Sequence, residues 1–372
     1  MKKINIANPY FDKEDKEFIH SEIDKILDNK LSMGPQVNKF EKEFAEKLNV
    51  KFAIATNSCT AALESVLNAI NCNGKEVILP AQTFIASGMS IYHSGAKPVF
   101  AEISKATFCL DIKDVRKKIS SKTAAIMLVH MGGYITPDIN DFVNLCNDKG
   151  IHLIEDAAHA PGAKINNKYA GSFGTAGCFS FFPTKVITSG EGGMITTNDE
   201  KIEKIARSFQ NRGRNMSHKD ELYQLPGRNI RMPEISALLG RTQLKNLEKY
   251  LKSRRIVADI YKNKLDNKFG VEVILPKDIE SSSCWKTLLL FDKSINRDDV
   301  ASELQSKGIQ VDTSYMPPLH LQPVMKEKYN FSKGLLPITE ELMNHHLCLP
   351  SHQLMTKEDA VYVSEELIKI IK

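Results

Sequence analysis

The chain has 372 residues, 42% of them hydrophobic and 26% charged, which is typical of a soluble globular protein long enough to bury one large core and a smaller one. Its 50 basic and 45 acidic residues leave a formal net charge of +5, and the two signs interleave along the chain. Because a nucleic-acid-binding protein shows a clustered basic stripe and this sequence has none, we do not expect a nucleic-acid partner.

The cysteines and the opening segment of the chain indicate the reducing environment of the cytoplasm. The seven cysteines form no C-x-x-C pair and lie mostly in apolar runs, which favours a reducing environment and predicts neither a disulfide framework nor a metal site. The opening segment reaches acidic residues before any apolar stretch of signal-peptide length. The apolar runs are far shorter than the ~20 residues of a membrane span. We expect a cytoplasmic protein without a membrane partner.

The first half of the chain alternates short apolar runs with helical patterns, which is typical of a mostly parallel sheet covered by helices on both faces. After this alternating part, two further apolar runs at 178–183 and 192–198 flank a glycine-rich turn and are predicted to be neighbouring strands. The earlier predicted strands are residues 51–56, 76–80, 97–103, 124–130 and 151–158, with helices at 60–70, 84–95, 111–119 and 138–150.

The second half begins with a long helical pattern from Pro233 to Leu265, in which Gly240 is the one strong breaker. Such a helix often leaves one domain and enters another. A smaller α/β pattern follows, and we therefore predict a large domain at 1–245, with the N-terminal segment packing near the small domain, and a small C-terminal domain at 246–372. The elements predicted in the small domain are strands at 271–275, 287–292 and 309–315 and helices at 298–308 and from 357.

Two residues suggest chemistry by their placement after predicted strands. Asp156 ends one strand, and ligands of open α/β sheets bind outside the carboxyl ends of strands. Lys185 follows another strand, between Pro183-Thr184 and a glycine-rich turn, where a lysine can be held rigidly and partly desolvated to form a Schiff base. Pyridoxal phosphate needs such a lysine and an anionic partner for its ring nitrogen. Singly, such an Asp is usually a helix cap and such a Lys a solvated loop residue.

A phosphate site is predicted where a strand meets the segment TNSCTAAL, which starts at Thr56. A short polar turn and a helix N-terminus supply the N–H groups and hydroxyls that a phosphate binds. Ser58 and Thr60 are equally suited to capping the helix. Ser180, on the segment before Lys185, could also reach the phosphate, or it could be a satisfied buried serine.

The sequence resembles the DegT/DnrJ/EryC1/StrS family of sugar aminotransferases, in segments that run nearly from end to end. The family has the α/β architecture of pyridoxal-phosphate-dependent transferases of fold type I, the aspartate aminotransferase-like fold, with a large, mostly parallel sheet domain and a small C-terminal α/β domain. The matching segments are residues 34–63, 78–103, 153–199, 227–247, 314–323 and 347–359, and they include QTFIAS, IEDAAHAPGA, FFPTK, GRNIRM and SYMPPLHLQP.

The resemblance implies a role for each matching residue. Lys185 would be the catalytic Schiff-base lysine that moves the proton, and Asp156 would pair with the pyridinium nitrogen. Arg231 is expected to be structural. The further roles are His159 near the phenolic oxygen, Phe84 stacked on the ring, Cys59, Thr60 and Ser180 on the phosphate, Asn229 on the phosphate of the neighbouring subunit in a homodimer, and Tyr315 and His320 at the substrate entrance.

One residue departs from the family pattern. Cys59 stands where the family usually has Gly, which keeps the backbone N–H donors but adds a side chain beside the phosphate. A reactive role is an alternative, because a thiol at a helix N-terminus has a lowered pKa.

The resemblance implies transfer of an amino group from glutamate to a keto-sugar, and the turn TKVITSGEGGM resembles members that aminate carbon 4 of a nucleotide-linked 4-keto-6-deoxysugar. The alternatives are amination of carbon 3 or of a non-nucleotide ketone, another pyridoxal-phosphate activity, and a non-catalytic regulator. Lys185 argues against the related dehydratases, which carry His there, and the absence of G-x-G-x-x-G after the first strand argues against a dehydrogenase. The loop from Asn215 to Gln224 is expected to shape the substrate site.

Overall fold

The computed structural model describes residues 2–215 and 222–372, so most of the loop expected to shape the substrate site lies outside the described residues. The central sheet has seven strands: β1 (Phe52–Thr56), β2 (Glu76–Pro80), β3 (Lys97–Ala101), β4 (Thr123–Val129), β5 (His152–Asp156), β8 (Ala176–Ser180) and β9 (Gly193–Thr197). Their order is β1-β9-β8-β5-β4-β2-β3. The pairings from β8 to β3 are parallel, and β9 runs antiparallel to both neighbours. The predicted α/β sheet, mostly parallel, is therefore present.

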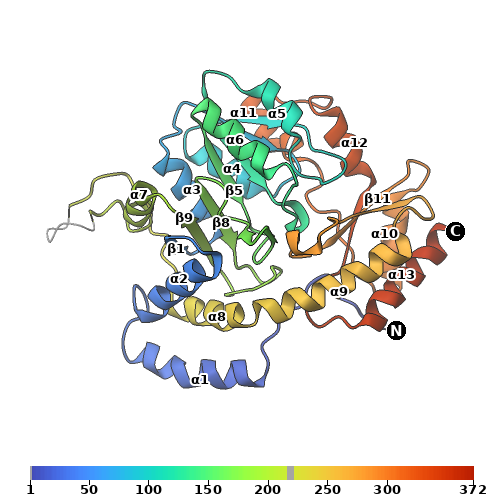
Figure 1. Ribbon diagram of the computed structural model, residues 1–372, viewed down its shortest axis with the longest axis horizontal. Coiled ribbons are helices and arrows are strands. Elements are labelled where there is room, and N and C mark those ends of the chain that lie inside the picture. The colour runs from blue at the N-terminus through green and yellow to red at the C-terminus, as the bar shows by residue number, and fades with distance from the viewer. Residues whose placement is uncertain (1, 216–221) are drawn as a thin grey trace.

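Helices pack on both faces of this sheet (Figure 1). One face is covered by α2 (Pro35–Leu48), α5 (Ile112–Lys118), α6 (Ile139–Lys149) and α8 (Glu234–Lys245). The other is covered by α3 (Cys59–Ala69), α4 (Ile85–His93), α7 (Glu200–Gln210) and α11 (Pro323–Tyr329). The remaining helices are α1 (Lys13–Leu27), α9 (Leu247–Leu265), α10 (Arg297–Ser306), α12 (Pro337–His345) and α13 (Lys357–Ile371), and a short hairpin joins β6 (Lys164–Ile165) to β7 (Lys168–Tyr169). No helix in the described part of the chain combines the length and the apolar composition that a bilayer crossing requires.

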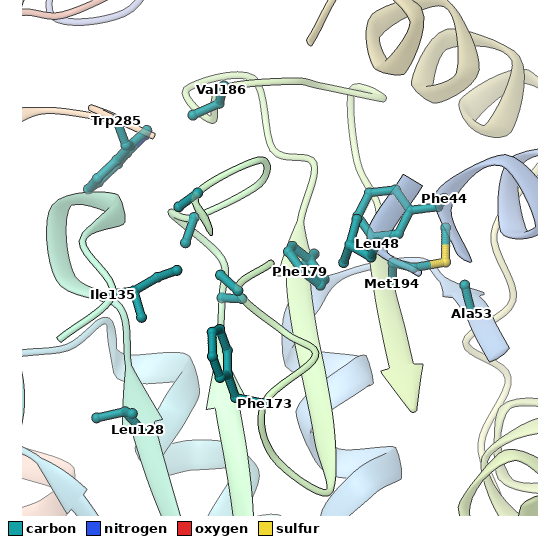
Figure 2. Packing of buried hydrophobic residues seen from close by; sticks show 14 of the residues in the cluster. Phe44, Leu48, Ala53, Leu128, Ile135, Phe173, Phe179, Val186, Met194 and Trp285 are labelled. Atoms are coloured by element: carbon teal, nitrogen blue, oxygen red, sulfur yellow. The ribbon is translucent and has the colours of Figure 1, made fainter. Parts of the chain in front are cut away.

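The strands supply both faces of the core because successive side chains of a strand point to opposite sides. In β4, Ile126 and Leu128 pack into one cluster, whereas Met127 packs into the other. Figure 2 shows part of the first cluster, where Phe44 of α2 lies close to Met194 of β9. Burial on both sides explains why these strands are continuous apolar runs and not alternating ones.

A second, antiparallel sheet is formed by β10 (Val271–Ile274), β11 (Thr287–Phe291) and β12 (His346–Leu349). It shares a separate apolar cluster with α9, α10 and α13. The N-terminal segment joins this cluster through Ile4, whose backbone exchanges hydrogen bonds with Gly308 and Gln310 at 2.9 Å each. Both chain termini lie at this end of the molecule (Figure 1).

The predicted single helix from Pro233 to Leu265 is wrong, because α8 and α9 are separate helices that meet at Asn246. The Asn246 side chain donates to the Asp15 carboxylate at 2.8 Å and to the Thr242 carbonyl at 3.3 Å. Asn side chains compete with the helix for backbone hydrogen bonds in this way, and the break follows from that competition.

The predicted strand at 309–315 is also wrong. This segment pairs with β12 through an isolated bridge between Asp312 and Cys348, and β12 supplies the third strand instead. Tyr315 adopts a positive φ of 73° that no strand allows, and Pro317 and Pro318 follow it. The segment leaves the sheet edge at the point where Tyr315 enters the functional site.

A buried carboxylate fixes the loop beneath the central sheet. Glu155 of β5 is fully buried and accepts hydrogen bonds from the backbone N–H groups of Phe173, Gly174 and Gly171 at 2.6, 2.7 and 2.7 Å. His130 Nε2 donates to the same carboxylate at 2.9 Å. The four donors compensate the cost of burying the charge, which would otherwise be large.

Glu155→Gln should lower the free energy of unfolding by about 3 kcal/mol, because the amide places N–H donors against backbone donors that need an acceptor. Urea denaturation followed by circular dichroism measures the change. Glu341→Gln is the control, since Glu341 belongs to a surface pair with Lys293. A Glu155→Gln protein as stable as the control protein would show that the carboxylate is dispensable.

Candidate active site

The functional cavity lies where the carboxyl ends of β1, β4, β5 and β8 meet, the expected place for a ligand in an open α/β sheet. Its volume is about 480 Å³. The predicted site residues that line it are Cys59, Thr60, Phe84, Asp156, His159, Ser180, Lys185 and Tyr315. Trp285 and Lys286, from the connection between β10 and β11 of the small sheet, also line it.

Lys185 is presented by a turn just after β8. Its backbone N–H donates to the Phe182 carbonyl at 2.9 Å, and its ammonium lies 4.5 Å from the centroid of the Trp285 ring. The Trp285 indole in turn donates to the Thr184 carbonyl at 2.7 Å, so the ring holds the turn that carries the lysine. Burial lowers the pKa of Lys185 to about 8, which makes a neutral, nucleophilic amine available near physiological pH.

Asp156 ends β5 and faces the cavity. Its carboxylate accepts from the Ser87 hydroxyl at 2.8 Å and from the Ala158 N–H at 3.2 Å, and Ser87 is itself bonded to Thr83 at 2.7 Å. Burial raises the pKa of Asp156, although these hydrogen bonds and the charge of Lys185 act in the opposite direction. In the described part of the chain Asp156 forms no ion pair, so a cationic group in the cavity would stabilise it.

His159 is held between two aromatic side chains. Its ring stacks on Trp285 at 3.7 Å between centroids, and its Nε2 is 2.8 Å from the Tyr315 hydroxyl. Burial, followed by the charges of Lys185 and Lys286, lowers the pKa of His159 well below its usual value, so the ring is neutral. Its Nδ1 is buried without a protein partner among the described residues.

The N-terminus of α3 opens into the cavity. The Ser58 side chain accepts from the Ala61 N–H at 3.2 Å and so caps the helix, which was one of the two predicted roles. The N–H groups of Cys59 and Thr60, in the first turn, have no partner within the helix. The sheet approaches this turn closely, since a side chain at Gly193 of β9 would lie 2.7 Å from the Cys59 nitrogen.

The alternative of a reactive Cys59 thiolate is not supported. Burial, together with the nearby Asp156 and Cys178, raises the pKa of the Cys59 thiol well above its usual value. This is the opposite of the lowered pKa that a reactive cysteine at a helix N-terminus needs.

Two predicted residues do not line the cavity. His320 is fully buried, and its Nε2 is paired with the Glu340 carboxylate at 2.9 Å, so its expected position at the substrate entrance is not supported. Asn229 is exposed and forms a backbone bridge with Asn211. Arg231 donates to the Asn211 side chain at 2.6 Å, a structural contact.

Comparison with known proteins identifies the family. The DegT/DnrJ/EryC1/StrS aminotransferase family matches residues 13–368. The chain belongs to this family. It is 33% identical to the GDP-perosamine synthase of Escherichia coli O157:H7 over 368 residues, which covers 99% of this chain and 98% of that protein. The predicted membership and enzymatic activity are therefore confirmed.

Solved structures of other aminotransferases confirm the predicted fold type. DesI, determined in the presence of its TDP-sugar product, has a TM-score of 0.88 at 28% identity, with 100% of this chain and 93% of that chain covered. The ntda protein of Bacillus subtilis, with bound cofactor PMP, has a TM-score of 0.89 at 28% identity and covers 100% of this chain and 86% of that chain.

The cavity of this family member fits pyridoxal phosphate. A buried carboxylate without an ion-pair partner, Asp156, matches a cationic ring nitrogen, and a lysine with a lowered pKa lies in the same cavity. Phe84 is 57% exposed and its ring lies 5.9 Å from that of Tyr315, so one aromatic face is free to stack. The first turn of α3 offers N–H donors to a phosphate.

Sequence reasoning missed four residues of the site. Ser87 stands three positions after Phe84 and orients Asp156, but a serine in a helix carries no signal by itself. Trp285, the one tryptophan in the sequence, and Lys286 precede a predicted strand, and Asp312 lies in a segment predicted as a strand. The available signal was that the one tryptophan of the sequence, Trp285, stands beside Lys286.

Acylation of the cofactor-free protein with acetic anhydride at a series of pH values tests the environment of Lys185. The labelling rate at Lys185 should reach half its maximum at a pH of about 8, because the reagent attacks only the neutral amine. Exposed lysines, which titrate near pH ~10.4, provide the internal control when labelled peptides are quantified by mass spectrometry. Labelling of Lys185 only in parallel with exposed lysines would contradict a desolvated amine.

Proposed function

We propose that this protein is a pyridoxal-phosphate-dependent transaminase that moves an amino group from glutamate to a nucleotide-linked keto-sugar. The observation that carries the proposal is the pairing in one cavity of Lys185, whose pKa is lowered to about 8, with the buried carboxylate of Asp156. Family membership and the similarity to DesI and GDP-perosamine synthase support the same class of substrate.

The cofactor is pyridoxal phosphate. When bound, it supplies a ring that accepts the electron pair released from the substrate carbon. Asp156 would pair with the protonated ring nitrogen, and Lys185 would hold the cofactor through Nζ and move the proton at the substrate carbon. His159, whose Nδ1 has no partner among the described residues, would lie near the phenolic oxygen. The first turn of α3 and the Ser180 hydroxyl would hold the phosphate, and Phe84 would stack on the ring.

The substrate is a keto-sugar attached to a nucleotide. The similarity to GDP-perosamine synthase and to DesI, whose structure was determined with its TDP-sugar product, supports a nucleoside diphosphate. The glycine-rich turn after Lys185 supports amination at carbon 4 of a 4-keto-6-deoxysugar, and Tyr315, at the cavity wall, would border the sugar. Amination at carbon 3 is the second candidate, because both carbons present a ketone to the same amine.

The active form is a homodimer of two-domain subunits. Asn229 is exposed and lies off the cavity of its own chain, as expected for a residue that completes the phosphate site of a partner subunit. The break between α8 and α9 at Asn246 supports a division into residues 1–245 and 246–372.

The absorbance spectrum of the purified protein with pyridoxal phosphate, before and after glutamate is added, tests the first half of the reaction. We expect a visible band of lysine-bound cofactor that gives way to near-ultraviolet absorbance. Lys185→Ala should show no lysine-bound band and should lose amino transfer at least ~10²-fold, because both the attachment point and the proton carrier are removed. Full turnover by Lys185→Ala would reject the assignment, and an unchanged wild-type band would reject glutamate as the donor.

Asp156→Asn should slow amino transfer about 10²-fold or more while the cofactor stays bound, because the amide cannot keep the ring nitrogen protonated. Stopped-flow absorbance after glutamate addition measures this step. Asp148→Asn, an exposed change on α6, is the control. An unchanged rate in Asp156→Asn would exclude the proposed role of the carboxylate.

A further inference from the structure

A second lysine shares the wall of the active site with Lys185. Lys286 is 7% exposed and lines the cavity, and its ammonium lies 4.2 Å from the centroid of the Trp285 ring. Lys185 approaches the same ring at 4.5 Å. Among the described residues that line the cavity, these two are the lysines, and no arginine is present. Since Lys185 is occupied by the cofactor, Lys286 is the cation that remains for an anionic substrate group.

Lys286 is paired with a carboxylate that has access to water. Its ammonium contacts Asp312 and lies 3.2 Å from the Ser314 hydroxyl, which also donates to Asp312 at 2.9 Å. The Asp312 side chain is 38% exposed, whereas that of Lys286 is 7% exposed. Asp312 also lines a neighbouring, more open hollow, which it shares with Ile6. The carboxylate can therefore turn into solvent while the ammonium stays in the cavity.

A transaminase of this kind has to accept two unlike substrates in one place. The amino donor carries a carboxylate two bonds from the reacting amine, whereas the reacting part of a keto-sugar is neutral. A buried cation without a partner would be costly when the sugar is bound, and a purely apolar wall would be costly when the acid is bound. A buried cation whose carboxylate partner is displaceable satisfies both states.

We propose that Lys286 binds a carboxylate of the amino donor and that this carboxylate replaces Asp312 as its ion-pair partner. The inference rests on the proposed transamination and names the donor subsite of that reaction. When the amino acid enters, Asp312 turns to solvent and the net charge around the ammonium is unchanged. When the sugar enters, the Lys286–Asp312 pair closes again and presents hydrogen-bonding groups to hydroxyls.

Binding of glutarate to the pyridoxal-phosphate-loaded protein, measured by isothermal titration calorimetry, tests the inference. Glutarate has both carboxylates of glutamate but no amine, so it binds without reacting. Lys286→Met should weaken glutarate binding by about 10- to 100-fold, the usual effect of losing a charge-assisted hydrogen bond. Lys286→Arg should retain most of the affinity, because it restores the charge.

Asp312→Asn should change the affinity for glutarate in the opposite direction. Removal of the competing carboxylate should strengthen glutarate binding by about 3- to 10-fold. A variant that merely disturbs the fold cannot bind more tightly, so this result separates ion-pair exchange from a structural role. Lys47→Met is the matched control, because Lys47 pairs with Glu248 at 2.5 Å and does not line the active-site cavity. Its affinity for glutarate should equal that of the wild type.

Three results would overturn the inference: wild-type protein that does not bind glutarate, Lys286→Met that binds it normally, or Asp312→Asn that binds it more weakly.

GDP serves as a second probe. If Lys286→Met loses affinity for GDP and not for glutarate, the lysine binds a phosphate and the donor assignment is wrong. Amino transfer from glutamate, followed separately, reports on the proposed function. Glutamate turnover with glutarate binding insensitive to Lys286 would reject only the subsite, whereas Lys286-dependent glutarate binding without transfer would reject the transamination.

Discussion

The buried carboxylate of Glu155 organises the part of the sheet that carries the chemistry. It accepts from three backbone N–H groups between Gly171 and Gly174 and from His130, and thereby ties the loop before β8 to β5. Because neighbouring side chains of a strand point to opposite faces, fixing Glu155 below the sheet also fixes Asp156 above it. Glu155 thus holds the loop before β8 in place, and Asp156 faces the cavity.

Trp285 connects this sheet to the C-terminal part of the chain. Its indole supports the turn that bears Lys185, its ring stacks on His159, and its own backbone is held by Gly132 and by the buried Arg254. The turn that carries Lys185 therefore depends on a ring contributed by the connection between β10 and β11 of the small sheet. A change in the position of that segment would be transmitted directly to the lysine.

Burial shifts the pKa values of three residues in the cavity, and each shift suits the proposed chemistry. Desolvation makes the amine of Lys185 nucleophilic and keeps His159 neutral, while it raises the pKa of Asp156 and so leaves its charge in need of a partner. A cationic cofactor ring would supply the ion-pair partner that Asp156 lacks among the described residues. Burying these groups lowers the stability of the folded protein without ligands, and ligands that bind to the site would raise it. Such costs are typical of functional sites with perturbed pKa values.

The sequence by itself determined the alternation of strands and helices, the positions of Asp156 and Lys185 after their strands and the helix N-terminus at Cys59, because apolar runs, turns and caps are local properties. It also carried the family resemblance. Only the tertiary structure decided that Asn246 breaks the long helix, that β12 and not residues 309–315 completes the small sheet, and that His320 is held by Glu340 away from the cavity. It alone placed Trp285, Lys286 and Asp312 beside Lys185. The contact between Trp285 and Thr184 joins residues 101 positions apart and depends on how two sheets pack, which no local pattern encodes.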